Sequence, residues 1–149
     1  MKNKSIYLSA LKLISRKDYS EVELKNRLTS IYANISDTEL NQTIEELKNK
    51  RYLDDFELAY FIVEKFLTKK KGYHYIISVL KYKQIKEEVI KNIEENFDYR
   101  KEFEIAKKFF TEKVKNRSSL QVLRMLSRRG FSFTTLEKVS EHFYKPEGE

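Results

Sequence analysis

Arg51-Tyr52-Leu53-Asp54-Asp55-Phe56-Glu57-Leu58-Ala59 is the stretch where one helical pattern ends and the next begins, without an intervening loop sequence. Asp54 and Glu57 have the spacing of a capping box, in which two side chains bond the free amides at a helix start. Asp55 adds a second acid, and acids are favoured at that end of the helix dipole. The stretch therefore predicts structural roles for Asp54, Asp55 and Glu57, and a second structural unit that begins at Asp54.

The composition favours helices throughout the chain. The protein has 149 residues, 40% hydrophobic and 36% charged, but only three glycines and one proline. So few turn formers are typical of an all-α protein. The chain has no cysteine, and no apolar run approaches the ~18 residues of a membrane span, so we expect neither disulfides nor a membrane segment. The basic N-terminus lacks a signal-peptide cleavage pattern, which leads us to expect a cytoplasmic protein.

Apolar spacing and helix-start signals divide the chain into nine expected helices. Ser20 with Glu23, and Ser36 with Glu39, have capping-box spacing. Gly130 is expected to stop the eighth helix, and the tail at 145–149 is expected to be loose. The expected helices lie at residues 6–16, 20–31, 36–53, 54–68, 73–82, 85–97, 99–114, 118–128 and 132–143.

The expected helices form three similar sets of three, which indicates an internal repeat. Leu28, Leu80 and Leu126 occupy the same place in the middle helix of each set, so all three should be buried. Each set is too small to bury its own apolar face, and stacking on its neighbours would supply the rest. We therefore expect an elongated, curved body of stacked repeats. The three repeats would span residues 1–53, 54–98 and 99–149.

Four short motifs follow one another along the chain. They are Ser20-x-x-Glu23-Leu24, Tyr52-Leu53-Asp54-Asp55 followed by Ala59, Lys71-Gly72 ahead of a helix ending in Leu80, and Arg128-Arg129-Gly130-Phe131. In this order and spacing they resemble the RecX family of bacterial recombination regulators. The resemblance implies three tandem three-helix repeats that bind the RecA recombinase filament. It also implies modulation, expected to be inhibition, of strand exchange and of the coprotease activity in the SOS response. The family pattern has glycine and phenylalanine where this chain has Arg51 and Leu58.

Positive charge is concentrated in two runs that contain no acidic residue. Residues 65–86 contain seven lysines and residues 113–129 contain six basic residues, in a chain of net charge +7. The first run also contains aromatic residues, and a stripe of basic and aromatic side chains would suit phosphates and bases or an acidic protein surface. For any single residue the alternative is a solvated side chain. The predicted partner-binding residues are Lys69, Lys70, Lys71, Tyr75, Lys81, Tyr82, Lys83, Arg117, Arg124, Arg128 and Arg129.

Two classes of function stay open. The resemblance implies a regulator whose partner is the RecA filament. The alternative is a helix-turn-helix-like module that binds single-stranded or double-stranded DNA directly, because a basic helix in a three-helix unit suits such a role. His74 and His142 are the only histidines, there is no cysteine to join them and no glycine-rich phosphate loop, so we expect no metal, cofactor or enzyme activity. We expect a monomer.

Overall fold

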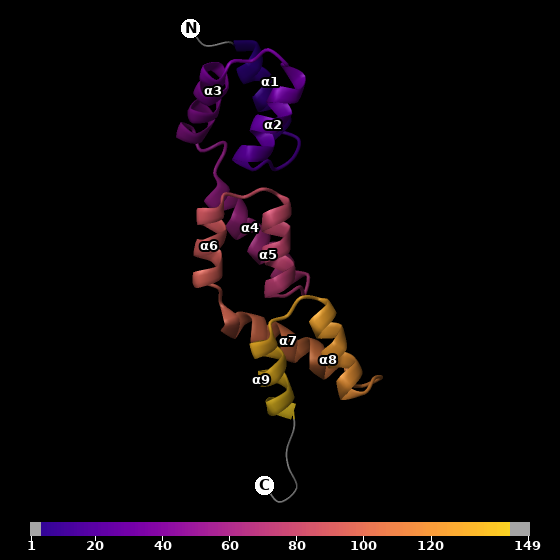
Figure 1. Ribbon diagram of the computed structural model, residues 1–149. Helices are drawn as coiled ribbons and strands as arrows, with labels where there is room; N and C mark the ends of the chain where they lie inside the picture. The colour runs from indigo at the N-terminus through magenta and orange to yellow at the C-terminus, as the bar shows by residue number, and fades with distance from the viewer. Residues whose placement is uncertain (1–3, 144–149) are drawn as a thin grey trace, which may run out of the picture. The chain divides into compact units, whose positions relative to one another are not determined.

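The computed structural model describes residues 4–143, and this part of the chain contains nine α-helices and no strand (Figure 1). The predicted all-α class is confirmed. None of the helices within 4–143 is both long and apolar enough to cross a bilayer. The tail predicted to be loose, 145–149, lies outside the described residues. The helices are α1 Lys4–Ile14, α2 Glu21–Ile31, α3 Asp37–Asn49, α4 Asp55–Thr68, α5 Tyr73–Tyr82, α6 Glu87–Glu95, α7 Tyr99–Lys113, α8 Ser119–Arg128 and α9 Phe133–Phe143.

Serine side chains begin α2 and α3, as the sequence predicts. The Glu23 amide donates a hydrogen bond to Ser20 Oγ, and the Ser20 amide donates one to Glu23 Oε1, both at 3.1 Å. Ser36 Oγ accepts a bond from the Glu39 amide at 3.1 Å. These caps satisfy amides that have no partner inside the helix.

Four helices end in the same backbone motif, with one residue in the left-handed conformation. These residues are Arg51 (φ 60°), Lys70 (φ 62°), Gln84 (φ 58°) and Gly130 (φ 89°). At each of them the amide bonds the carbonyl three residues back, and the next amide bonds the carbonyl five residues back, which is the Schellman pattern. Gly130 is thus confirmed as a helix stop. The motif at Arg51 ends α3 at Asn49, so the helix predicted to reach residue 53 is too long.

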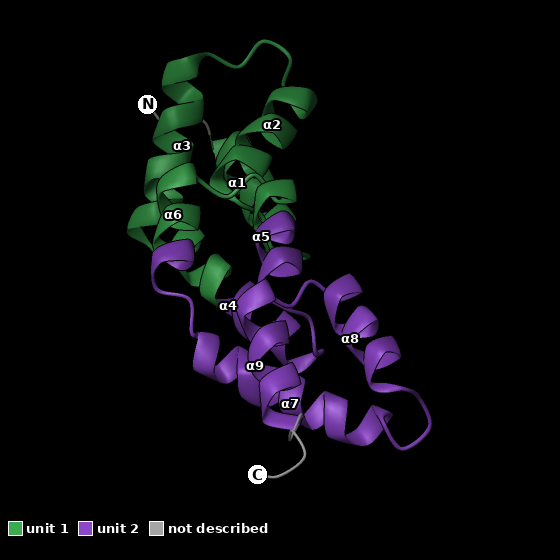
Figure 2. Cartoon of the chain, turned by 60° about the horizontal axis from the view of Figure 1, so that its bottom comes forward, with its two compact units in different colours: residues 1–60, 80–92 green, residues 61–79, 93–149 purple. Residues whose placement is uncertain are grey.

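The chain folds into two compact units, and α4, α5 and α6 each contribute to both (Figure 2). The first unit contains residues 1–60 and 80–92, and the second contains residues 61–79 and 93–149. The three-repeat division after residues 53 and 98 stays a prediction.

Each unit has an apolar core. In the first unit, α1, α2, α3 and the turn before α4 contribute a buried cluster of Ile6, Ala10, Leu24, Leu28, Ile44, Leu47 and Leu53. In the second unit, α7, α8, α9 and the turn before α9 contribute Ala106, Phe109, Phe110, Val122, Leu126, Phe131 and Val139. Leu28, Leu80 and Leu126 are all 0% exposed, which confirms that the three predicted leucines are buried.

Candidate partner-binding surface

Three of the predicted arginines are placed by α8. Ser118 and Gln121 form a capping box at its start, with amide-to-side-chain distances of 3.0 and 3.2 Å. A valine and a leucine of α8 are buried in the core of the second unit. Arg117, just before the cap, and Arg124 and Arg128 on the helix are exposed. Because the apolar face of α8 is held against the core, these guanidinium groups are presented to solvent.

The predicted lysines at 69–71 form the loop between α4 and α5. Lys70, in the left-handed conformation, turns the chain, and Lys69 and Lys70 are exposed. The Lys71 ammonium lies 4.7 Å from the centre of the Tyr75 ring, and that ring lies 5.2 Å from the ring of Phe66. The charge and the aromatic ring predicted to bind a partner are therefore adjacent, and a cation–π contact holds them.

The second unit brings this loop against the turn between α8 and α9. The Arg129 guanidinium donates hydrogen bonds to the carbonyl oxygens of Lys70 (2.7 Å) and Lys69 (2.9 Å), and it stacks 5.4 Å from the Phe109 ring centre. The Gly72 amide donates to the Arg129 carbonyl oxygen at 2.9 Å. Lys69–Lys71 and Arg128–Arg129 are therefore brought together, but the charge of Arg129 is used to hold the loop.

Glycine is required on both sides of this contact. A Cβ atom at Gly72 would lie 2.3 Å from the Cα of Phe131, and one at Gly130 would lie 2.5 Å from the amide nitrogen of Tyr75. The His74 amide also donates to the Gly130 carbonyl oxygen at 2.8 Å. The approach of the two backbones explains why the Lys71-Gly72 and Gly130-Phe131 motifs contain glycine.

Lys81, Tyr82 and Lys83 belong to the first unit. Tyr82 is 85% exposed and Lys81 is exposed. The Lys83 ammonium instead donates to the Asp18 carbonyl oxygen at 2.7 Å and pairs with Glu23 at 3.0 Å. Lys83 thus has a structural role in the first unit, and the continuous surface that would join Tyr82 to the arginines stays a prediction.

Asp54 and Asp55 at the 51–59 junction accept backbone hydrogen bonds at helix starts, and Asp55 bonds more of the fold than predicted; the role of the Glu57 side chain stays a prediction. Asp54 Oδ1 accepts a hydrogen bond from the Glu57 amide at 3.1 Å, which confirms the cap. Asp55 is only 9% exposed, and its two oxygens accept from the Glu21 amide (2.9 Å) and the Lys86 amide (3.0 Å). Asp55 therefore joins the starts of α2 and α6 to its own helix.

Glu102 of α7 is the equivalent acid in the second unit. Its Oε2 accepts hydrogen bonds from the amides of Tyr73 (2.7 Å) and Ser132 (3.4 Å). Its Oε1 accepts from the hydroxyls of Ser132 (2.6 Å) and Thr135. The side chain is 0% exposed, so this carboxylate joins the starts of α5 and α9 inside the protein.

Sequence reasoning missed Glu102, although a signal was present. Glu102 lies four residues before Ala106 and seven before Phe109, which places it on the apolar face of α7. An acid on a buried face needs several hydrogen-bond donors, and the start of another helix can supply them.

Glu21 is a third buried acid, but its partners are charged. Its carboxylate pairs with the ammonium groups of Lys86 (2.8 Å) and Lys48 (3.0 Å). Burial alone would raise the pKa of Glu21, but hydrogen bonds and charge from the two lysines lower it below its ordinary value. Lys86, at the end of the first basic run, therefore stabilises the first unit.

Fold and surface together define a small all-α protein whose net positive charge favours association with negatively charged partners. Within residues 4–143, no group of three or more His, Asp or Glu side chains is arranged to hold a metal ion.

Comparison with known proteins identifies the family. The chain is 30% identical over 133 residues to regulatory protein RecX of Vibrio vulnificus (strain CMCP6), and the match covers 84% of each protein. Its fold is similar to a crystal structure of regulatory protein RecX, with a TM-score of 0.72, 22% identity and coverage of 93% of this chain and 72% of that one. It is also similar to RecX from Lactobacillus salivarius, with a TM-score of 0.77, 18% identity and coverage of 93% and 94%. No protein-family model matches the chain. The chain belongs to the RecX family.

Proposed function

We propose that this protein binds the RecA–DNA filament and inhibits its recombinase and coprotease activities. The observation that carries the proposal is membership of the RecX family, through a relative that is named a regulatory protein. A regulator of this kind acts in the cytoplasm, and we propose that it binds as a monomer of three repeats.

The exposed basic residues support this role. Arg117, Arg124 and Arg128 are exposed on or beside α8, and Lys69–Lys71 are held near the end of that helix by Arg129. A filament that contains DNA carries regularly spaced negative charge. These cations would attract it at separations up to about one Debye length, beyond which salt screens the interaction. Tyrosine rings beside the cations would add contacts that salt does not screen.

The test reverses charge on the exposed face of α8. In the variant with Arg124→Glu and Arg128→Glu, binding to RecA-coated fluorescent DNA should fall by tenfold or more, and inhibition of strand exchange should fall with it. The control with Lys12→Glu and Lys91→Glu changes net charge by the same amount at exposed positions on α1 and α6. Equal losses in both variants would mean that overall charge, rather than the α8 surface, is responsible, and the surface would be withdrawn.

The tyrosines test the other half of the surface. Tyr75→Ala and Tyr82→Ala should each weaken filament binding with little change in its salt dependence, because a ring contact carries no net charge. A tyrosine variant that changed the salt slope as much as the arginine reversal would contradict separate roles for charge and rings.

Direct DNA binding is the second candidate, and one contact argues against base reading by α8. Gln121 lies in the first turn, where a recognition helix contacts bases, but its Oε1 accepts the Ser118 amide in the capping box. A salt titration against bare single-stranded and double-stranded DNA and against RecA-coated DNA distinguishes the two candidates. Equal affinity for bare and coated DNA would favour the DNA-binding module.

A further inference from the structure

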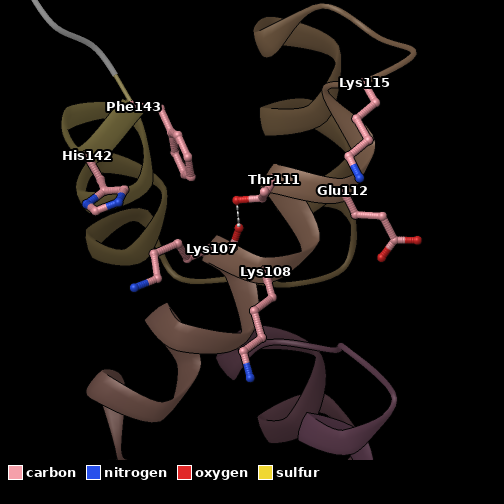
Figure 3. Close-up of a pocket in the computed structure, with 7 residues that line it drawn as sticks. All are labelled: Lys107, Lys108, Thr111, Glu112, Lys115, His142 and Phe143. Carbon is pink, nitrogen blue, oxygen red and sulfur yellow. Dashed lines mark hydrogen bonds between the residues drawn. The ribbon is translucent and has the colours of Figure 1, made fainter.

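A second basic surface is formed by residues of α7, the turn after it and the end of α9, and none of the residues predicted to bind a partner lines it. It is a pocket of about 340 Å³ in the second unit (Figure 3). One carboxylate lines it, together with four basic or imidazole side chains. The lining residues are Lys107, Lys108, Thr111, Glu112, Lys115, His142 and Phe143.

The lysines of this pocket lie on α7 and just beyond its end. Lys107 and Thr111 are four residues apart and share one face of the helix, and Lys115 lies in the turn that follows Lys113, where α7 ends. Lys107 is oriented by a pair with Glu104 at 3.2 Å and by the Phe103 ring, 5.6 Å from its ammonium. Lys115 is exposed. An extended ligand with repeated negative charges can meet both lysines at once.

An aromatic ring lies beside this row of charges. Figure 3 shows the Phe143 side chain reaching from α9 toward Thr111 on α7. The ring stacks on Phe110, with 4.6 Å between ring centres and 27° between planes, and Phe110 is buried. Phe143 is nevertheless 39% exposed, so the buried ring supports it and leaves part of it accessible.

We propose that this α7–α9 groove binds single-stranded nucleic acid, with phosphates on Lys107 and Lys115 and a base against Phe143. Proteins that bind single strands without sequence preference combine basic side chains, which contact the phosphates, with aromatic side chains, on which the bases stack. An acidic peptide fits less well, because its carboxylates would meet the lysines but would offer no base to stack on the accessible Phe143 ring. The proposal does not depend on filament binding, since its ligand is a bare strand.

The first experiment measures anisotropy of fluorescein-labelled oligo-dT, without RecA, over a range of salt concentrations. The variant with Lys107→Gln and Lys115→Gln should bind more weakly, and its salt slope should be smaller by about 1.4, or about 0.7 for each lost phosphate contact. The control with Lys12→Gln and Lys91→Gln removes the same charge at exposed positions in the first unit and should retain the slope. The same loss of slope in both variants would overturn the groove as the site.

The second experiment tests the ring. Phe143→Leu keeps an apolar side chain on Phe110 but removes the stacking surface, so affinity should fall about fivefold to hundredfold with the salt slope unchanged. Phe143→Tyr retains a ring and should bind as the unchanged protein does, with both variants melting at the same temperature. Displacement of oligo-dT by poly-glutamate at the same concentration of negative charge would overturn the proposal in favour of an acidic peptide. Failure of poly-glutamate to compete would support it.

Discussion

Two of the buried carboxylates, Glu102 and Asp55, should cost the protein different amounts of stability when each is changed to its amide. Glu102 accepts hydrogen bonds from two backbone amides on the same oxygen, Oε2, and from two hydroxyls on Oε1. A glutamine can keep its oxygen toward the two amides and place its NH₂ toward the hydroxyls, which can rotate to accept. Glu102→Gln should therefore destabilise the protein by only about 1 kcal/mol, from the weaker bonds of an uncharged acceptor.

Asp55 accepts one backbone amide on each oxygen. In Asp55→Asn, the NH₂ group must face an amide of Glu21 or Lys86, and a backbone amide cannot become an acceptor. One buried donor is then left without a partner, at a cost of roughly 1–3 kcal/mol. Asp55→Asn should therefore cost more than Glu102→Gln, although Glu102 is the more buried side chain.

Truncation removes both acceptors. Glu102→Ala leaves the amides of Tyr73 and Ser132 without a partner, so the free energy of unfolding should fall by roughly 2–6 kcal/mol, at 1–3 kcal/mol for each amide. Urea unfolding followed by circular dichroism measures these differences, with Glu104→Gln as the control at an exposed position of α7, expected within about 0.5 kcal/mol of the unchanged protein. Equal costs for the glutamine and alanine variants at 102, or a smaller cost for Asp55→Asn than for Glu102→Gln, would refute this account of the hydrogen bonds.

Three further predictions concern stability. Arg51→Gly and Gln84→Gly should each raise the free energy of unfolding by up to about 1 kcal/mol, because a side chain is strained at φ near 60°; a lower melting temperature in both would contradict the strain argument. Leu28→Ala, Leu80→Ala and Leu126→Ala should each cost roughly 2–5 kcal/mol in urea unfolding, since all three side chains are fully buried, and a cost under 1 kcal/mol at any one would argue against a packed core there. The pKa of Glu21 is lower in the folded protein than the ordinary value of 4.5, so its ion pairs stabilise the fold above about pH 4.5. This contribution is lost as the pH falls through the folded pKa. Glu21→Gln should therefore reduce the fall in melting temperature between neutral and acidic pH, and an unchanged fall would show that other carboxylates cause it.

The parts of the fold that follow from neighbouring residues could be predicted from the sequence. Ser20 and Glu23 are three residues apart, and a capping box depends on nothing beyond that turn. The spacing of Leu28 and Leu126 within their helices likewise defines a buried face. Helix ends at Arg51 and Gln84 were harder to predict, because sequence rules look for glycine or asparagine in a left-handed residue, and here tertiary structure holds other side chains in that conformation.

The long-range hydrogen bonds could not be predicted in the same way. Asp55 bonds amides 34 and 31 residues away, at Glu21 and Lys86, and no local pattern records which helix start will lie beside it. The roles of Lys83 and Arg129 were missed for the same reason. Both belong to basic runs that suggested a binding surface, but each donates to carbonyl oxygens about 60 residues away, at 59, 60 and 65 residues.

Basic residues in this chain therefore have two separate roles, and adjacent residues can differ. Arg129 donates to two carbonyl oxygens of the α4–α5 loop, whereas its neighbour Arg128 is exposed. Reversal of charge at Arg129 would release Lys69 and Lys70 from their present positions and could abolish binding without any contact between the guanidinium and a partner. Reversal at Arg128 changes only what the surface presents, because the side chain projects from a helix whose opposite face is buried. A binding defect therefore locates the surface only when it comes from a residue that, like Arg128, does not hold another part of the chain in place.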